Sequence, residues 1–169
     1  MTSYIFTIFI KKNAEFKGNF STILLMDVLE HIADPVEFLD SASYHLSPGG
    51  KIIINVPAIQ MLYSRYDSVL GHIKRYRLAT ITSELARAGF HIERAGYWGL
   101  ALVPLLLIRK FVVKFFKDEN VTEIGFQPNS QLIRHLLNLL MLIETKLFVS
   151  TVIGASLVVI ARKKVLATK

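Results

Sequence analysis

The chain has 169 residues, of which 52% are hydrophobic, and it carries a net charge of +7. This length fits one domain. There is no cysteine, which excludes disulfide bonds, thiolate metal sites and a cysteine nucleophile. A basic surface suits a nucleic acid, an anionic membrane or an anionic substrate, but the interleaved basic and aromatic residues that stack bases are missing. We therefore expect no nucleic-acid partner and favour peripheral contact with a membrane.

The N-terminal residues 4–10 are apolar and β-prone, which predicts a strand; a frayed terminus is the alternative interpretation. Residues 13–19 are too short for a helical crossover, so this strand would pair antiparallel with residues 23–26 and cover their edge. Residues 1–12 lack the cleavage site of a signal peptide, and no stretch reaches eighteen uncharged apolar residues. The expected location is the cytoplasm, peripheral at the membrane.

The central stretch, residues 23–57, predicts a strand, a helix and a second strand. Residues 23–26 form a short apolar run, which suits a parallel strand buried on both faces. Asp34 is the expected helix N-cap, and residues 47–50, Ser-Pro-Gly-Gly, are expected to end the helix as a turn. Residues 51–56 are a β-branched strand. Together they predict one right-handed βαβ unit of a doubly wound parallel sheet.

The rest of the chain predicts further helices and strands. Residues 58–78 indicate a loop with a short helix, and residues 80–88 a helix with Thr80 as its N-cap and Gly89 at its end. The remaining expected elements are strands at residues 90–97 and 154–162 and apolar helices at residues 99–117 and 129–149.

Several fragments, in this order, resemble the class I S-adenosylmethionine-dependent methyltransferases. They are L-M-D-V-L-E-H at 25–31, L-S-P-G-G at 46–50, G-H-I-K-R-Y at 71–76, A-G-F at 88–90 and G-A-S-L-V-V at 154–159. The resemblance runs from about residue 20 to residue 164. It implies an α/β fold, a partial Rossmann-like sheet with the family's fourth, fifth, seventh and sixth strands in that spatial order. The last strand would be antiparallel, with flanking helices and two apolar C-terminal helices.

The sequence departs from this family in its N-terminal part. It contains no glycine-rich G-x-G-x-G loop and no acidic residue placed to hold the ribose, and its only Gly-Gly pair, Gly49-Gly50, lies elsewhere. The resemblance therefore implies the C-terminal half of such an enzyme, with a missing N-terminal half as a partner. We expect a single truncated domain that binds S-adenosylmethionine weakly or not at all. Its expected parts are an atypical segment 1–19, a core 20–97, an apolar helical insertion 98–150 and a last strand 151–164.

The first candidate site follows residues 23–26, at the end of a parallel strand where doubly wound sheets bind ligands. The resemblance implies that Met26 and Asp27 lie beside the sulfonium of the cofactor. Asp27, Glu30 and His31 supply two carboxylates and an imidazole, which can bind a hard divalent ion. In the ubiquinone-biosynthesis O-methyltransferases that this segment resembles, Glu replaces Asp27 and the cluster is linked to Mg²⁺. The alternative is that Glu30 and His31 only cap and orient the strand end.

The second candidate site is the G-H-x-R-Y-like segment, which resembles a lid or substrate loop and contributes His72, Arg75 and Tyr76 as candidate catalytic residues. His72 can act as a general base because histidine titrates near neutral pH. The forked donors of Arg75 can hold a phosphate or a carboxylate. The alternative is a solvated loop in which His72 and Arg75 bind Asp67 or the backbone.

The two apolar helices have three interpretations: a flap over the core, an interfacial membrane anchor, or a dimer face. Basic residues beside leucine and phenylalanine, at Arg109, Lys110, Lys114 and Lys117, fit an interfacial helix. The sequence thus predicts a methyltransferase with a small-molecule or lipid-linked substrate, incomplete as a catalyst by itself. The alternative is a non-catalytic, membrane-associated or scaffold remnant.

Overall fold

The computed structural model describes residues 12–115, 131–146 and 152–164, and the strand expected at residues 4–10 lies outside them. The chain forms two compact units. The first unit comprises Met1–Val56, Leu78–Ala95 and Val158–Lys169; the second comprises Pro57–Arg77 and Gly96–Leu157. The expected boundaries placed residues 57–77 with the sheet, whereas the structure groups this segment with the apolar helices.

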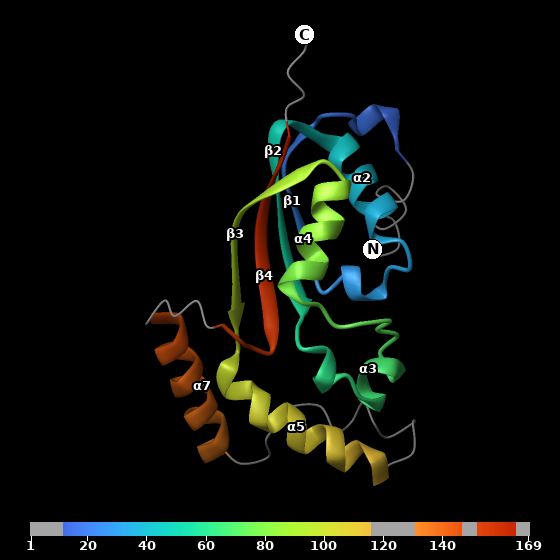
Figure 1. The fold of residues 1–169 in the computed structure, drawn as a ribbon. Helices are drawn as coiled ribbons and strands as arrows, with labels where there is room; N and C mark the ends of the chain where they lie inside the picture. The colour runs from blue at the N-terminus through green and yellow to red at the C-terminus, as the bar shows by residue number, and fades with distance from the viewer. Residues whose placement is uncertain (1–11, 116–130, 147–151, 165–169) are drawn as a thin grey trace. The chain divides into compact units, whose positions relative to one another are not determined.

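Four strands form one sheet in the order β1-β2-β4-β3 (Figure 1), which confirms the predicted order. β1 is parallel to β2. β4 runs antiparallel to β3, because Lys164 N donates to Gly89 O at one end and Ala155 N to Gly99 O at the other. The strand bounds are β1 Phe20–Met26, β2 Leu46–Pro57, β3 Phe90–Trp98 and β4 Ser156–Lys163.

Helix α2 (Pro35–His45) connects β1 to β2, and its predicted N-cap is confirmed. Asp34 Oδ1 accepts hydrogen bonds from the backbone N–H groups of Val36 and Glu37 at 3.1 and 3.0 Å. At the other end of the helix, Lys163 Nζ of β4 donates to the carbonyls of Ser43 and Leu46 at 2.6 and 2.9 Å. A cation there satisfies carbonyls that a helix C-terminus leaves without intrahelical donors.

The turn expected at residues 47–50 is instead part of β2, which begins directly after α2 at Leu46. The pairing steps from Phe20↔Leu46 to Thr22↔Lys51, so residues 47–50 form an irregularity inside the strand. A Cβ at Gly50 would lie 3.0 Å from Ser47 O and 3.2 Å from Ser21 O. Proline and glycine therefore mark a bulged strand start here, where the sequence pattern favoured a loop.

The expectation that the first strand is buried on both faces was wrong. In β1 burial alternates: Ile23 and Leu25 are in the core, whereas Leu24 and Met26 are 60% and 47% exposed. β1 is the edge strand among the strands described, with β2 on its inner side. A run of four apolar residues shows β propensity, but which face is covered depends on neighbours that lie elsewhere in the sequence.

Helix α4 (Leu78–Arg87) begins two residues earlier than predicted, so Thr80 lies inside the helix and is not its N-cap. Ile81, Leu85 and Ala88 are buried and mark its inner face. Gly89 follows the helix with φ +80°, as a helix-ending glycine commonly does. Two short 3₁₀ helices complete the first unit, η1 (Ala14–Phe16) and η2 (Leu29–His31).

The second unit is mostly helical and has its own small core. Leu62, Leu106 and Ala155 are buried together. Glu144 Oε1 accepts hydrogen bonds from Gly99 N at 2.6 Å and Leu100 N at 3.1 Å, which ties α7 to the start of η4. No helix in the described ranges combines the length and apolar character needed to cross a bilayer. The elements are η3 Gln60–Leu62, α3 Arg65–Val69, η4 Leu100–Leu102, α5 Val103–Val112, η5 Val113–Phe115 and α7 Gln131–Lys146.

Candidate functional site

The carboxyl end of β1 carries the two residues expected near a cofactor, Met26 and Asp27. Asp27 has φ +52°, a left-handed conformation that is uncommon for a residue other than glycine. Asn55, at the neighbouring end of β2, donates from Nδ2 to Asp27 Oδ1 at 3.0 Å. Because β1 and β2 are parallel, both residues lie at the ligand-binding edge of the sheet. Asp27 is exposed, so its carboxylate is accessible.

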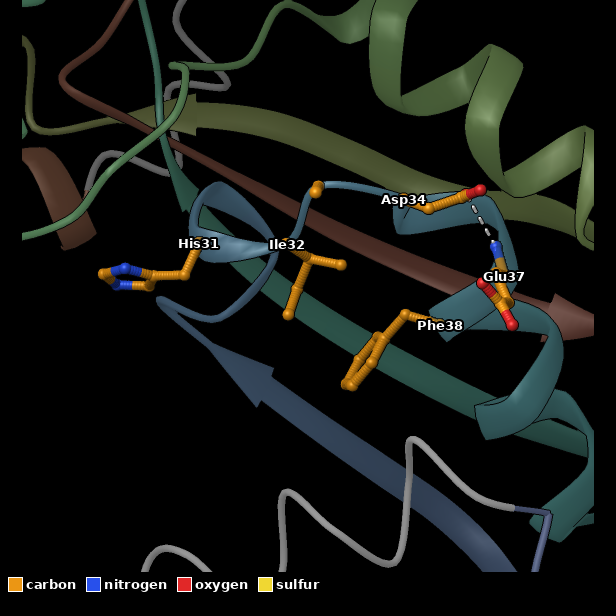
Figure 2. Close-up of a pocket in the computed structure, with 6 residues that line it drawn as sticks. His31, Ile32, Asp34, Glu37 and Phe38 are labelled. Carbon is orange, nitrogen blue, oxygen red and sulfur yellow. Dashed lines mark hydrogen bonds between the residues drawn. The ribbon is translucent and has the colours of Figure 1, made fainter.

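A pocket of about 330 Å³ opens beside the loop that follows β1 (Figure 2). Its side chains come from η2, the segment after it and the first turn of α2. Figure 2 shows Ile32 and Phe38 projecting to the same side, while His31 extends away from them. This volume is at the lower end of the range for small-molecule sites. The lining residues are His31, Ile32, Ala33, Asp34, Glu37 and Phe38.

Asp27 does not join the other two predicted metal ligands, Glu30 and His31, whose side chains offer ligand atoms within 4.8 Å of each other. In the described part of the chain, no group of metal-ligating side chains with suitable spacing contains Asp27. Glu30 is fully buried, whereas Asp27 and His31 are exposed. Asp27 is instead bonded to Asn55. A Mg²⁺ site built from Asp27, Glu30 and His31 is therefore not supported by this geometry.

In the second unit, Asp67 is the centre of a hydrogen-bonded cluster. Its side chain is fully buried and pairs with the guanidinium of Arg75, at 2.8 Å to Nε and 2.7 Å to Nη2. The other oxygen, Oδ2, accepts from Ser64 N at 2.9 Å and lies 3.1 Å from Ser64 Oγ, forming a capping box at the start of α3. His72 Nδ1 lies 3.2 Å from Asp67 Oδ1. The Asp67 carboxylate thus contacts both the start of α3 and the segment after α3 that carries His72 and Arg75.

The charge state of Asp67 follows from these contacts. Burial alone would raise its pKa, but the charge and hydrogen bonds of Arg75, with further hydrogen bonds from Ser64 and His72, hold the pKa below its ordinary value of 3.8. Asp67 is therefore ionised at neutral pH. An ionised Asp67 favours the His72 tautomer with its proton on Nδ1, because that N–H can donate a hydrogen bond to the carboxylate.

The contacts of Arg75 and Tyr76 are largely structural. Arg75 Nη1 donates to Ala58 O at 3.2 Å, so its guanidinium is engaged on both sides within the loop. Tyr76 is fully buried, and its backbone N–H bonds Pro57 O at 2.8 Å. The Lys74 ammonium lies 4.7 Å from the centre of the Tyr76 ring. These are the contacts of the alternative interpretation, in which this segment binds Asp67 and the backbone; a catalytic role for the three residues stays a prediction.

The alternative interpretation of the sequence had Asp67 as a partner of His72 and Arg75, but the contact of Asp67 with Ser64 was not foreseen. The signal was present: Ser64 and Asp67 have the S-x-x-D spacing of a capping box. Tyr63 adds a second unforeseen contact, because its hydroxyl donates to His72 O at 2.7 Å. The loop that carries His72 is thus held at several backbone points.

Residues 5–95 match the family model described as a methyltransferase domain, which covers more than half of the chain. The chain belongs to this methyltransferase family. Together with the sheet order, the match confirms the predicted class I S-adenosylmethionine-dependent methyltransferase fold.

Individual relatives of this methyltransferase-family chain agree with the assignment. It is 49% identical over 41 residues to a ubiquinone biosynthesis O-methyltransferase of Caulobacter sp. (strain K31), a match that covers 24% of this chain and 16% of the relative. A S-adenosylmethionine-dependent methyltransferase structure from Thermotoga maritima superposes with a TM-score of 0.51 at 16% identity, covering 90% of this chain and 60% of that one. The cyclase SpnF gives 0.51 at 17% identity, covering 93% and 54%. The match to the curated relative thus spans only a small part of it, and the solved structures share the fold alone.

Proposed function

We propose that this chain contributes the acceptor side of a S-adenosylmethionine-dependent methyltransferase that acts on a small-molecule or lipid-linked acceptor. The observation that carries the proposal is the match of residues 5–95 to the methyltransferase domain. The similarity to a ubiquinone biosynthesis O-methyltransferase over 41 residues favours an acceptor that is an oxygen nucleophile. The fold by itself does not decide the reaction, because this chain also shares its architecture with a cyclase.

The residues at the end of β1 fit part of a cofactor site. S-adenosylmethionine supplies a methyl group already activated by its sulfonium, so the protein mainly has to bind and orient. The accessible carboxylate of Asp27, held by Asn55, suits a ligand that carries hydroxyl groups or positive charge. The backbone at Met26 would form the adjoining wall. The sequence has no G-x-G-x-G segment to cradle the rest of the cofactor, so we propose that a second segment must supply it.

On the acceptor side, His72 is the residue suited to hold a proton. Asp67 orients the ring through Nδ1, and the imidazole positioned in this way would take a proton from an acceptor hydroxyl. Arg75 and Tyr76 take a positioning role in this proposal, because Arg75 already bonds Asp67 and Ala58 and Tyr76 is buried. For Arg75 to bind an anionic group of a substrate, its buried ion pair with Asp67 would have to break.

Calorimetric titration of the chain with S-adenosylmethionine tests the proposed division of the site. We expect weak or undetectable binding by the chain alone. A low-micromolar dissociation constant would show that the cofactor site is complete here. The Asp27→Ala variant should then lose affinity, and Asp40→Ala, an exposed carboxylate on the outer side of α2, should not.

The nucleotide sequence upstream of the Met1 codon gives a second test. An open frame encoding a glycine-rich loop would supply the segment that the proposal requires, and the longer product should bind the cofactor and transfer its methyl group. If neither the chain nor that product binds the cofactor, the non-catalytic scaffold alternative would replace this proposal.

A further inference from the structure

Two helical segments of the second unit expose apolar stripes to solvent. On α5 and η5 the exposed side chains are Ile108, Phe111, Val112 and Phe115, at the i, i+3, i+4, i+7 spacing of one helix face. On α7 the exposed side chains with the same spacing are Leu136, Leu139, Leu140 and Ile143, joined by Leu142. We call these two sets the apolar stripes.

The apolar stripe of α5 and η5 is not the core-facing side of these segments. Their buried residues are Leu106 and Val113, which do not belong to the stripe. Phe115 is 86% exposed and Phe111 62% exposed. Single exposed leucines are ordinary on a protein surface, but ordered stripes of large apolar side chains indicate a surface that is covered in use.

Among the described residues of the second unit, the charged side chains that are exposed are mostly basic. In the described part of the second unit there are two acidic side chains, Asp67 and Glu144. Asp67 is buried against Arg75, and Glu144 bonds the backbone N–H groups of Gly99 and Leu100. The exposed Asp, Glu, Lys and Arg side chains of the same residues are all basic: Arg65, Arg77, Lys114, Arg134 and Lys146.

This combination discriminates between possible partners. A second copy of the chain would bring like charges together, which costs free energy at an interface. An anionic lipid surface attracts the basic residues and takes up the apolar side chains at the boundary between headgroups and acyl chains. Lys114 shows a suitable geometry: its ammonium lies 5.2 Å from the centre of the Phe111 ring, so the aliphatic stem follows the apolar face while the charge stays at the surface.

We propose that the apolar stripes of α5–η5 and α7 dock onto an anionic lipid surface. The helices lie in the plane of the interface. The phenylalanines and leucines enter it, and Lys114, Arg134 and Lys146 pair with lipid phosphates. This docking goes beyond the proposed methyl transfer and does not depend on it, since it requires neither cofactor nor acceptor.

Vesicle sedimentation with the full chain tests the proposal. One set of vesicles contains phosphatidylcholine alone and the other contains phosphatidylcholine mixed with phosphatidylglycerol. We expect binding to the mixed vesicles only, weakened by added salt. The double variant Phe111→Ser/Phe115→Ser should lower the partition coefficient by about tenfold or more, and Lys114→Glu/Lys146→Glu should lower it similarly. All four residues are exposed, so these variants should remain folded, as circular dichroism would verify.

Matched variants in the first unit provide the controls. Leu24→Ser/Met26→Ser removes exposed apolar side chains that do not belong to the stripes, and Arg87→Glu reverses an exposed charge. Both should leave vesicle binding unchanged. Equal binding to neutral and mixed vesicles, no binding to either, or equal losses in the control variants would overturn the proposal. A dimer in sedimentation equilibrium that the stripe variants dissociate would overturn it in favour of a second copy.

Discussion

The two units present different surfaces to solvent. The first unit exposes six acidic side chains, at Glu15, Asp27, Asp34, Glu37, Asp40 and Glu93, and the described residues of the second unit expose none. Of the twenty large hydrophobic side chains exposed in the described residues, three lie in the first unit and seventeen in the second. Net charge and average hydrophobicity do not reveal this division, because they average over the whole chain, whereas the described residues of the first unit expose charges of both signs and those of the second expose basic and apolar side chains.

The units also hold their charges by different means. In the first unit Glu93 pairs at the surface with Lys51 and Arg162. In the second unit the pair of Asp67 and Arg75 is buried. Exposed ion pairs contribute little to stability, whereas removing one partner of a buried pair leaves an uncompensated charge inside the protein. The same type of substitution should therefore have unequal effects in the two units.

The largest effect is expected for Asp67→Asn. The change leaves the Arg75 guanidinium buried without a counter-charge and should lower the free energy of unfolding by about 3–5 kcal/mol. Urea unfolding measures the loss. Hydrogen exchange should place it at amides around the loop, such as His72 N, which donates to Asp67 O. Glu93→Gln is the matched control, with only a small expected change; an equal loss in both variants would contradict the contrast between the units.

Lowering the pH should gradually remove the contribution of Asp67 to the free energy of unfolding. The pKa of Asp67 is lower in the folded chain than its ordinary value of 3.8. Its stabilisation is therefore fully present above that value and is lost as the pH falls through the folded pKa. The difference in unfolding free energy between the native chain and Asp67→Asn should be constant near neutral pH and shrink below about pH 4. A difference that persists at pH 2–3 would mean that Asp67 acts through packing instead of charge.

Two glycines, one in each unit, differ in how closely other backbone atoms approach them. At Gly154 in the second unit, an added Cβ would lie 2.7 Å from Trp98 N and 2.8 Å from Trp98 C, both backbone atoms at the end of β3. At Gly50 in the first unit the closest atom would be Ser47 O at 3.0 Å. Gly154→Ala should therefore cost about 3 kcal/mol and Gly50→Ala about 1 kcal/mol. Thermal unfolding would show the order, and a larger loss at Gly50 would mean that the β2 irregularity is the more rigid of the two sites.

The smallest effect is expected for exposed apolar positions. Leu139→Ser on α7 and Leu24→Ser on β1 each remove a side chain that is more than half exposed. Each should change the free energy of unfolding by less than about 0.5 kcal/mol. The two variants should differ instead in vesicle binding. A loss of several kcal/mol at Leu139 would show that α7 packs against another part of the protein.

Much of the fold could be predicted, because fragments in a fixed order indicated the family and the family implies the sheet order. The helix cap at Asp34 also followed from local chemistry. The exposed face of β1 could not be predicted from residues 23–26, since burial is decided by neighbours distant in the sequence. Residues 47–50 were misassigned because proline and glycine mark a bulged strand start as well as a turn.

The candidate site was harder to predict than the fold. Asp27, Glu30 and His31 are close in sequence, but Asp27, in a left-handed conformation, does not join Glu30 and His31, whose ligand atoms lie within 4.8 Å of each other. The spacing of residues in the sequence does not predict in which direction their side chains point after a sharp turn. Conversely, the cluster around Asp67 joins residues up to eight positions away from it through a helix start. Binding of His72 and Arg75 to Asp67 was the alternative interpretation of the sequence, and the capping-box spacing was a further readable sign.

The position of β4 has a consequence for how the chain folds during synthesis. β4 is the last described strand in the sequence, yet it lies between β2 and β3. Until residues 156–163 have left the ribosome, β2 and β3 lack the neighbour that joins them, and the carbonyls of Ser43 and Leu46 lack Lys163. Sheets that depend on such distant pairings fold slowly and leave strand edges open meanwhile. The nascent chain should therefore be most prone to aggregation just before its final segment emerges.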